Sequence, residues 1–227
     1  MDERVSKILL CVERGKVDAA SPYPPDLRGQ EGADELTRQA LAAGAGPDEV
    51  LAACDEGMKR IGDKFGAGKA FVPELLMSAK AMKTAMLHLK PFFASGQVQA
   101  KGVFVVGTVA GDLHDIGKNL VCMMLEGAGF EVVDLGTDVS PERFVEAAQG
   151  DGVNLVAMSA LLTTTMGNMK ATLAALDAAG MRGKVKVMVG GAPVTERFAH
   201  QIGADGYAPD ASRAVAVARA LVEAPGA

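Results

Sequence analysis

Tryptophan is absent from the 227 residues, and phenylalanine and tyrosine bring the aromatic share to only 4%. Basic residues are scattered along the chain, and the formal net charge is −5. A surface that binds nucleic acid needs a basic footprint and usually aromatic side chains on which bases stack. The sequence therefore argues against a nucleic-acid partner.

Cysteine and histidine are also scarce. The three cysteines lie far apart and form no C-x-x-C pair, which argues against a disulfide framework and against a thiolate zinc site. A zinc hydrolase needs about three protein ligands. Only three histidines exist, and His88 and His200 lie among polar neighbours where surface positions are expected. A metal that a macrocycle already holds, and that needs one imidazole from the protein, fits this inventory better.

Long apolar runs are missing as well. The N-terminus mixes charges and leads into a short amphipathic segment, so it resembles neither a signal peptide nor a membrane span. We therefore expect a cytoplasmic protein without membrane contact. Hydrophobic residues make up 49% of the chain, enough to fill the cores of one large or two modest domains.

The first part of the chain, residues 1–92, has apolar residues three and four positions apart and no alternating run. This spacing predicts four helices that form a small bundle. Pro91 and the polar residues after it interrupt the helical pattern, so we place a linker at residues 93–101. Three prolines keep the loop Ser21 to Asp26 out of any helix, and its role stays open.

From residue 102 to residue 227 the pattern changes to strand, turn and helix, repeated. This order predicts an α/β domain with a doubly wound, flavodoxin-like sheet of five parallel strands. Ligands bind such sheets at the carboxyl ends of the strands. The segments expected at these ends are rich in glycine, serine and threonine; they are residues 107–117, 136–138, 159–165, 190–192 and 208–210.

The turn after the first of these strands carries Asp112 and His114. A carboxylate two residues from a histidine can hold one ring nitrogen while the other meets a metal. Two simpler interpretations stay open: Asp112 as a helix cap, and His114 as a structural or merely exposed side chain. The turn lacks the G-x-G-x-x-G pattern of dinucleotide sites, and Gly117-Lys118 is followed by Asn119, which excludes a phosphate loop.

Asp112-x-His114-x-x-Gly117, then Ser159-x-Leu161, then Gly190-Gly191 resemble, in order and spacing, the signature of the corrinoid (B12-binding) proteins of methyl-transfer systems. The helical half, with Phe65 and Val72-Pro73, is similar to the cap module that precedes the B12 domain in cobalamin-dependent methionine synthase and in small methyl-carrying corrinoid proteins. The resemblance thus covers nearly the whole chain. It implies a helical cap followed by a cobalamin-binding domain.

The resemblance also implies roles for particular residues. His114 would be the lower ligand of cobalt in a base-off cobalamin, Asp112 would bind its other nitrogen, and Thr165 would complete the relay, where methionine synthase has a serine. Phe65 and Val72 would shield the upper face of the cofactor. The other residues expected to line the corrin or its nucleotide tail are Gly107, Asp115, Ile116, Gly117, Ser159, Leu161, Thr163, Gly190, Gly191 and Tyr207.

By the same resemblance, the protein would be a carrier without catalysis of its own. One methyltransferase would place a methyl group on Co(I), and a second would move it from methyl-Co(III) to a thiol or a folate-type acceptor. A reductive activase would be a further partner. The alternative is a cobalamin-dependent sensor or regulatory binding module. The sequence leaves open the methyl donor, the acceptor, the particular corrinoid and the oligomeric state.

Overall fold

The computed structural model describes residues 3–94 and 102–223. The chain divides into two compact units: Met1–Ala100 with Glu126–Gly129, and Lys101–Leu125 with Phe130–Ala227. Most of the expected linker, residues 95–101, lies outside the described residues. The domain bounds 1–92 and 102–227 stay predictions.

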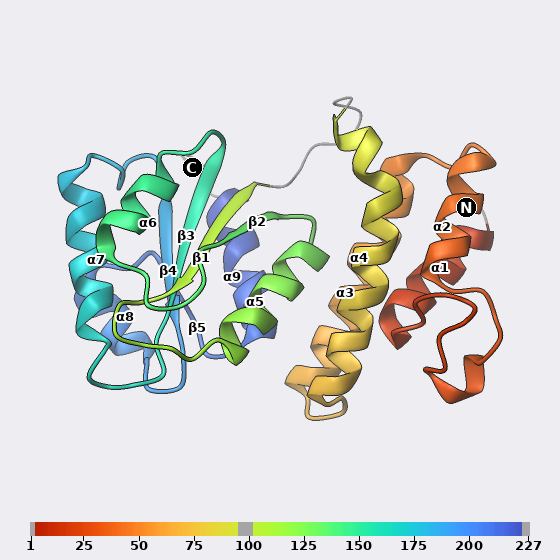
Figure 1. Cartoon of the computed structure of the whole chain (residues 1–227), viewed down its shortest axis with the longest axis horizontal. Helices are drawn as coiled ribbons and strands as arrows, with labels where there is room; N and C mark the ends of the chain where they lie inside the picture. The colour runs from red at the N-terminus through yellow and green to blue at the C-terminus, as the bar shows by residue number, and fades with distance from the viewer. Residues whose placement is uncertain (1–2, 95–101, 224–227) are drawn as a thin grey trace. The chain divides into compact units, whose positions relative to one another are not determined.

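The first unit is built from helices α1 (Glu3–Arg14), α2 (Ala33–Ala42), α3 (Pro47–Gly66) and α4 (Val72–Ala94), with a 3₁₀ turn at Pro25–Leu27 (Figure 1). Helix α3 starts as its sequence predicts, with Pro47 in the first turn and two acids after it. Each helix packs on the others through one apolar face. The predicted helical bundle is confirmed.

The prediction that Pro91 ends the last of these helices is wrong, because α4 continues to Ala94. A proline inside a helix loses one bond, here to the carbonyl of Leu87 four residues earlier. Both residues lie on the solvent side of α4, and the Leu87 side chain is 64% exposed. Water can bind the freed carbonyl there, and only one more helical turn follows, so the local cost is small.

Side chains of α1, of α2 and of Lys16, which follows α1, hold the proline-rich loop and its flanking residues. Arg14 makes two parallel hydrogen bonds of 2.8 Å to the carboxylate of Asp26. Lys16, whose side chain is fully buried, donates from Nζ to the Ser21 carbonyl at 2.9 Å. Glu35 accepts the N–H groups of Ala19 and Gly32 at 3.0 and 2.9 Å. The loop is therefore an ordered part of this unit.

The second unit contains a sheet of five parallel strands, as predicted, and the strands lie in the order β2-β1-β3-β4-β5. Figure 1 shows α6, α7 and α8 over one face of the sheet and α5 and α9 over the other. The strands are β1 (Val103–Thr108), β2 (Glu131–Asp134), β3 (Val153–Ser159), β4 (Lys186–Gly190) and β5 (Gly206–Ala208). The helices are α5 (Ile116–Gly127), α6 (Pro141–Ala148), α7 (Gly167–Ala178), α8 (Glu196–Ile202) and α9 (Ala211–Glu223).

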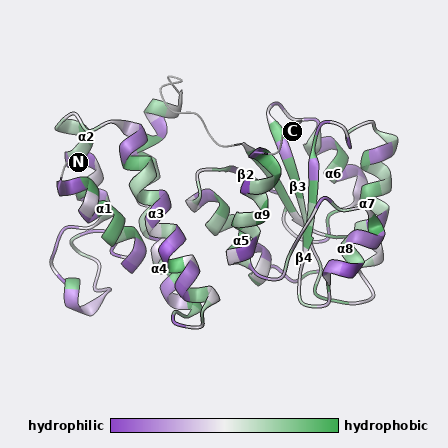
Figure 2. Ribbon diagram, turned by 180° about the vertical axis from the view of Figure 1, so that it is seen from behind, coloured by the Kyte–Doolittle hydropathy of each residue, from purple (hydrophilic) through white to green (hydrophobic). Residues whose placement is uncertain are grey.

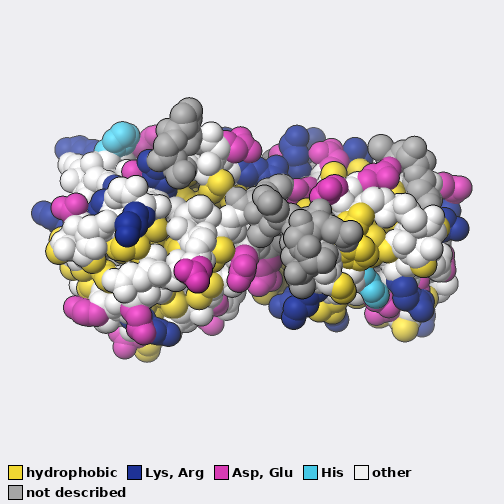
Figure 3. All heavy atoms as spheres, turned by 90° about the horizontal axis from the view of Figure 1, so that it is seen from above, with side chains coloured by type: hydrophobic (Ala, Val, Ile, Leu, Met, Phe, Trp, Pro, Cys, Tyr) yellow, Lys and Arg dark blue, Asp and Glu magenta, His cyan; other side chains and the backbone are white. Residues whose placement is uncertain are grey.

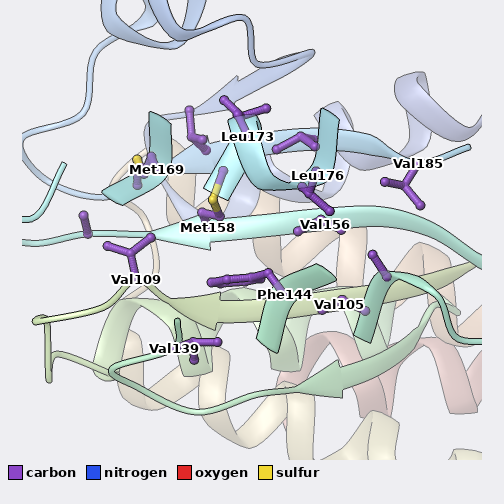
Figure 4. Packing of buried hydrophobic residues seen from close by; sticks show 14 of the residues in the cluster. Val105, Val109, Val139, Phe144, Val156, Met158, Met169, Leu173, Leu176 and Val185 are labelled. Atoms are coloured by element: carbon purple, nitrogen blue, oxygen red, sulfur yellow. The ribbon is translucent and has the colours of Figure 1, made fainter. Parts of the chain in front are cut away.

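One buried cluster of this unit includes Phe144 of α6, which is fully buried and belongs to the same cluster as Val105, Val139 and Met158 (Figure 4). Figure 2 shows the hydrophobic colour along β4, whereas α3 and α4 carry both colours, as expected for helices with one buried face. A Cβ on Gly107 would lie 2.8 Å from the Phe144 ring. Close packing against this ring is therefore a sufficient reason for a glycine at position 107.

Charged side chains of both signs alternate over the face drawn in Figure 3, with apolar patches between them. Within residues 3–94 and 102–223, none of the helices combines the length and the apolar character that crossing a bilayer requires.

Candidate functional site

The segment Val109–Asp115, called here the histidine loop, joins the end of β1 to the start of α5. Its first residue continues the sheet, since Val109 donates its N–H to Ser159 on β3 at 3.0 Å and bridges to Val139. The loop therefore starts at the carboxyl edge of the sheet, between β1 and β3. The chain continues from β1 to β2 on one side of this pair and from β3 to β4 on the other side. Ligands bind parallel sheets at such a switch point.

Asp112 is completely buried, and both oxygens of its carboxylate are hydrogen-bonded. Oδ1 lies 2.7 Å from Nδ1 of His114, and Oδ2 accepts the N–H groups of Leu161 and Leu162 at 2.8 and 3.1 Å. The Thr165 hydroxyl lies 2.8 Å from Oδ2. Helix α5 begins only at Ile116. Asp112 thus joins two loops across the sheet edge, and the helix-cap interpretation is wrong.

These contacts set the charge of the Asp112 carboxylate. Burial alone would raise its pKa, but the N–H of Leu161, the His114 ring, the Thr165 hydroxyl and the N–H of Leu162 together hold the pKa well below its usual range. The group is therefore an anion at neutral pH. An anion at 2.7 Å from Nδ1 favours the tautomer with hydrogen on that nitrogen.

His114 is half exposed, with 50% of its side chain accessible to solvent. Because Asp112 takes Nδ1, the free electron pair of the neutral ring lies on Nε2. The loop thus presents one oriented imidazole nitrogen at the surface of the unit. No group of three or more potential metal-binding His, Cys, Asp or Glu side chains gathers in the part of the chain that the structure describes. Such a nitrogen suits a metal that other ligands already hold.

Thr165 precedes α7, and its buried hydroxyl has two acceptors at the same distance. Oγ1 lies 2.8 Å from Asp112 Oδ2 and 2.8 Å from the carbonyl of Leu162. A hydroxyl has one hydrogen, so it can donate to only one of them at a time. A turn of the O–H bond alone, with the oxygen in place, can therefore make or break the hydrogen bond from Thr165 to Asp112.

Gly190 and Gly191 lie where the sequence predicts, at the end of β4, but neighbouring backbone explains them. A Cβ on Gly191 would lie 1.9 Å from the Ala160 carbonyl oxygen, and its φ is +122°. A Cβ on Gly190 would lie 2.7 Å from the carbonyl oxygen of Ala208. Close approach of the strand ends requires both glycines, whether or not a ligand passes there.

Gly117 differs, because no atom lies within 4 Å of a Cβ built on it and its φ is not positive. Internal packing therefore gives no reason for a glycine in this first turn of α5. Around the imidazole, large apolar side chains lie in solvent instead of the core; their exposed fractions are 73% for Leu113, 76% for Ile116, 43% for Leu161 and 41% for Leu162. An oriented imidazole, with exposed apolar side chains on its own loop and on the loop that holds Asp112, fits a broad, largely apolar macrocycle.

The other predicted residues are not equally placed. Ser159 ends β3 beside Thr108 and Gly190, and Thr163 is exposed in the loop that binds Asp112. Asp115 accepts the amide of Asn119 at 3.1 Å, which stabilises the start of α5. Tyr207 packs on the sheet core. Phe65 and Val72 belong to the first unit, on α3 and α4, and their role at the upper face of the cofactor stays a prediction.

Three side chains that the motif does not include also hold the histidine loop. Thr108 donates to the His114 carbonyl at 2.9 Å, and Asn168 of α7 donates to the Ala110 carbonyl at 2.6 Å. Asp138 accepts the N–H of Gly111 at 2.7 Å. The sequence indicates Asp138 only through its place in the segment 136–138, which was expected at the carboxyl end of a strand. Nothing in the sequence pairs Asn168 with this loop.

Comparison with known proteins agrees with this site. Residues 102–216 match a family described as B12 binding domain, and residues 29–90 match a second family of the same description. The dimethylamine corrinoid protein of Methanosarcina barkeri is 40% identical over 223 residues, which are 98% of this chain and 97% of that protein. The trimethylamine corrinoid protein of the same organism is 45% identical over 193 residues, 84% of this chain and 89% of that protein.

Solved structures are similar along the whole chain. A cobalamin-binding protein from Desulfitobacterium hafniense has a TM-score of 0.75 and 29% identity, with 96% of this chain and 98% of that chain covered. The methanol:cobalamin methyltransferase complex from Methanosarcina barkeri contains a chain with a TM-score of 0.79 and 30% identity, with coverage of 99% and 81%.

The fold and the site thus define a class of protein in which a helical module is followed along the chain by a cobalamin-binding domain with a parallel sheet. The chain belongs to the corrinoid proteins of methyltransferase systems, which bind a corrinoid and carry a methyl group between methyltransferases.

Proposed function

We propose that His114 is the ligand that this chain gives to the cobalt of its corrinoid, through Nε2. One observation carries the proposal: a buried, ionised Asp112 holds Nδ1 of a half-exposed imidazole at 2.7 Å. A carboxylate that holds the second nitrogen is the usual support of a metal-bound histidine. The cofactor, when bound, supplies the cobalt that accepts and releases the methyl group.

The chain's own residues orient that imidazole. Asp112 fixes the tautomer and the ring direction, while the N–H groups of Leu161 and Leu162 fix Asp112. Thr165 adjusts the negative charge on Oδ2, because its hydrogen can point to Asp112 or to the Leu162 carbonyl. More charge on Asp112 makes Nε2 a stronger electron donor. In this proposal Asp112, Thr165 and the two backbone N–H groups together tune how tightly His114 can hold a metal.

Spin resonance of the full chain loaded with Co(II) cobalamin tests the ligation. Protein labelled with ¹⁵N-histidine separates an imidazole from the benzimidazole of the cofactor, because only a coordinated ¹⁵N changes the nitrogen splitting from a triplet to a doublet. We expect the doublet in the wild type and its loss in His114→Ala. His200→Ala is the matched control, since its ring is exposed on α8. A triplet in the labelled wild type contradicts the proposal.

We further propose a methylamine as the methyl donor. The support is the extent of the similarity: relatives named as dimethylamine and trimethylamine corrinoid proteins share 40% and 45% identity with the chain over most of its length. The reduced, corrinoid-loaded protein should be methylated by a methylamine methyltransferase with dimethylamine or trimethylamine. Methylation with methanol and its methyltransferase alone would contradict this assignment.

The remaining partners follow from the same proposal. A second methyltransferase would take the methyl group to a thiol or a folate-type acceptor. A reductive activase would return inactivated cobalt to Co(I). The system would work in the cytoplasm. The rival function, a cobalamin-dependent sensor, predicts binding of the cofactor without methylation by any donor system. Cap residues Phe65 and Val72 would shield the methyl-bearing face, so Phe65→Ala should speed loss of the methyl group in light.

A further inference from the structure

Asp138 has an unusual backbone. It lies four residues after the end of β2, and its φ of 54° is the one positive value among the non-glycine residues that the structure describes. An L side chain is strained in this region, and glycine occupies it at lower cost, although aspartate and asparagine tolerate it better than most residues. Gly136, two positions earlier, has a φ of +84° and is the residue type that usually takes a positive φ. A strained aspartate that persists invites a functional explanation.

The contacts of Asp138 supply one. Its carboxylate oxygen Oδ1 accepts the N–H of Gly111 at 2.7 Å, and its own N–H donates to the carbonyl of Asp112 at 3.0 Å. Asp138 therefore holds the chain at two successive residues, Gly111 and Asp112, which precede His114 by three and two positions. Asp138 makes both contacts, one through its side chain and one through its N–H, while its backbone is left-handed.

We propose that Asp138 is a positioning residue for His114. It fixes the main chain at Gly111 and Asp112, and so fixes where Oδ1 of Asp112 meets the imidazole. Asp112 transmits the constraint because its other oxygen is already held by Leu161 and Leu162 from the far loop. Gly111 has a φ of +79°, and because glycine lacks a Cβ its backbone can rotate widely. Such a rotation would swing the imidazole away from the cofactor. The inference rests on the proposed ligation of cobalt by His114.

Three substitutions separate this role from a purely structural one. Asp138→Asn keeps an oxygen acceptor for Gly111 and tolerates positive φ. Asp138→Gly removes the acceptor but relieves the backbone strain, so the fold should keep or gain stability. Asp138→Ala removes the acceptor and keeps the strain. If the role is structural, Asp138→Gly should keep the wild-type share of histidine-coordinated cobalt. If the role is positioning, Asp138→Gly should lose coordination as Asp138→Ala does, and Asp138→Asn should resemble the wild type.

The measurement is the ratio of histidine-coordinated to uncoordinated Co(II) cobalamin in the ¹⁵N-histidine-labelled full chain. We expect the ratio to fall about threefold to tenfold in Asp138→Gly, the range that loss of one hydrogen bond gives, and to recover in Asp138→Asn. In the cofactor-free chain, the amide proton of Gly111 should shift upfield in Asp138→Gly while the melting temperature does not fall.

A wild-type ratio in Asp138→Gly, beside a wild type that shows the imidazole doublet, overturns this inference alone. A wild type without the doublet overturns the ligation by His114 and the inference with it. A parallel fall of the melting temperature and the ratio in all three variants, Asn included, also overturns it, because the residue would then act only through the fold.

Discussion

Thr108 donates its hydroxyl hydrogen to the main-chain carbonyl of His114 at 2.9 Å. The donor is fully buried at the end of β1, and the acceptor belongs to the residue that presents its imidazole to solvent. The last residue of a rigid strand thus holds the far end of the histidine loop, five residues beyond the point where the loop leaves the sheet.

Replacing Thr108 with valine should loosen this hold. The change keeps the shape of the side chain and removes one hydrogen bond, so the free energy of unfolding should fall by about 1 kcal/mol. We also expect a smaller share of histidine-coordinated cobalt. Ser78→Ala is the matched control, because Ser78 is equally buried and donates to the Glu13 carbonyl at 3.1 Å in the other unit. An equal change of coordination in both variants would contradict the specific role of Thr108.

Glu35 predicts a pH dependence in the first unit. Burial raises the pKa of Glu35, but the hydrogen bonds from the N–H groups of Ala19 and Gly32 outweigh this effect, so the net shift of the pKa is downward. A depressed pKa means that the group stabilises the fold above its unfolded value of about 4.3 and that this contribution is lost as the pH falls through the folded pKa. At pH 7, Glu35→Gln should cost about 1 kcal/mol, the scale of one hydrogen bond.

Urea unfolding at several pH values checks this prediction. The difference in unfolding free energy between the wild type and Glu35→Gln should shrink as the pH falls from neutral into the acid range below the unfolded value. Glu142→Gln is the control, since its pKa is also lowered, first by its own backbone N–H and then by Ser140, but it is exposed on α6. A constant difference for Glu35→Gln at all pH values would contradict the assignment.

Much of this site is visible in the sequence because its main residues are near neighbours. Asp112 and His114 lie two apart, and their pairing needs only a turn. The parallel sheet could be predicted because its strands alternate with helices, and the observed sheet has the five parallel strands that were expected. Local pattern therefore gave the fold class and the centre of the site.

Residues that act across the sheet edge were harder to find. Asn168 is 58 positions from Ala110, and nothing in either segment indicates that they meet. The grip of Asp138 depends on a left-handed backbone that the sequence does not specify for a non-glycine residue. Pro91 shows the opposite error: a strong helix breaker was tolerated because it lies on the exposed side of the last turns of α4.

Gly191 should be one of the least replaceable glycines. A Cβ there would lie 1.9 Å from the Ala160 carbonyl oxygen, and the φ of +122° is unsuitable for other residues. Gly191→Ala should therefore reduce the free energy of unfolding by more than about 3 kcal/mol. Gly180→Ala is the control: its φ is +68° with no atom within 4 Å, so about 1 kcal/mol of strain is expected. Thermal melting of the cofactor-free chains compares them, and equal losses would contradict the clash.

Gly117 should separate cofactor binding from folding. Its φ is not positive, and a Cβ would meet no atom of the protein within 4 Å. Because Gly117 lies in the first turn of α5, alanine should leave the fold unchanged or stabilise it by up to about 1 kcal/mol. The same methyl group would stand on the exposed surface three residues after His114, where we expect the corrin. Corrinoid affinity should therefore fall by about tenfold or more, the effect of a poorly accommodated methyl group.

Titration of the cofactor-free chain with hydroxocobalamin measures that affinity, and melting of the same preparation measures stability. Gly167→Ala is the matched control, because it also lies at the start of a helix, α7, with no atom within 4 Å of a built Cβ. Affinity that stays at the wild-type value in Gly117→Ala would place the corrin elsewhere on the sheet edge. A loss of stability would instead mean that the first turn of α5 needs glycine for its own conformation.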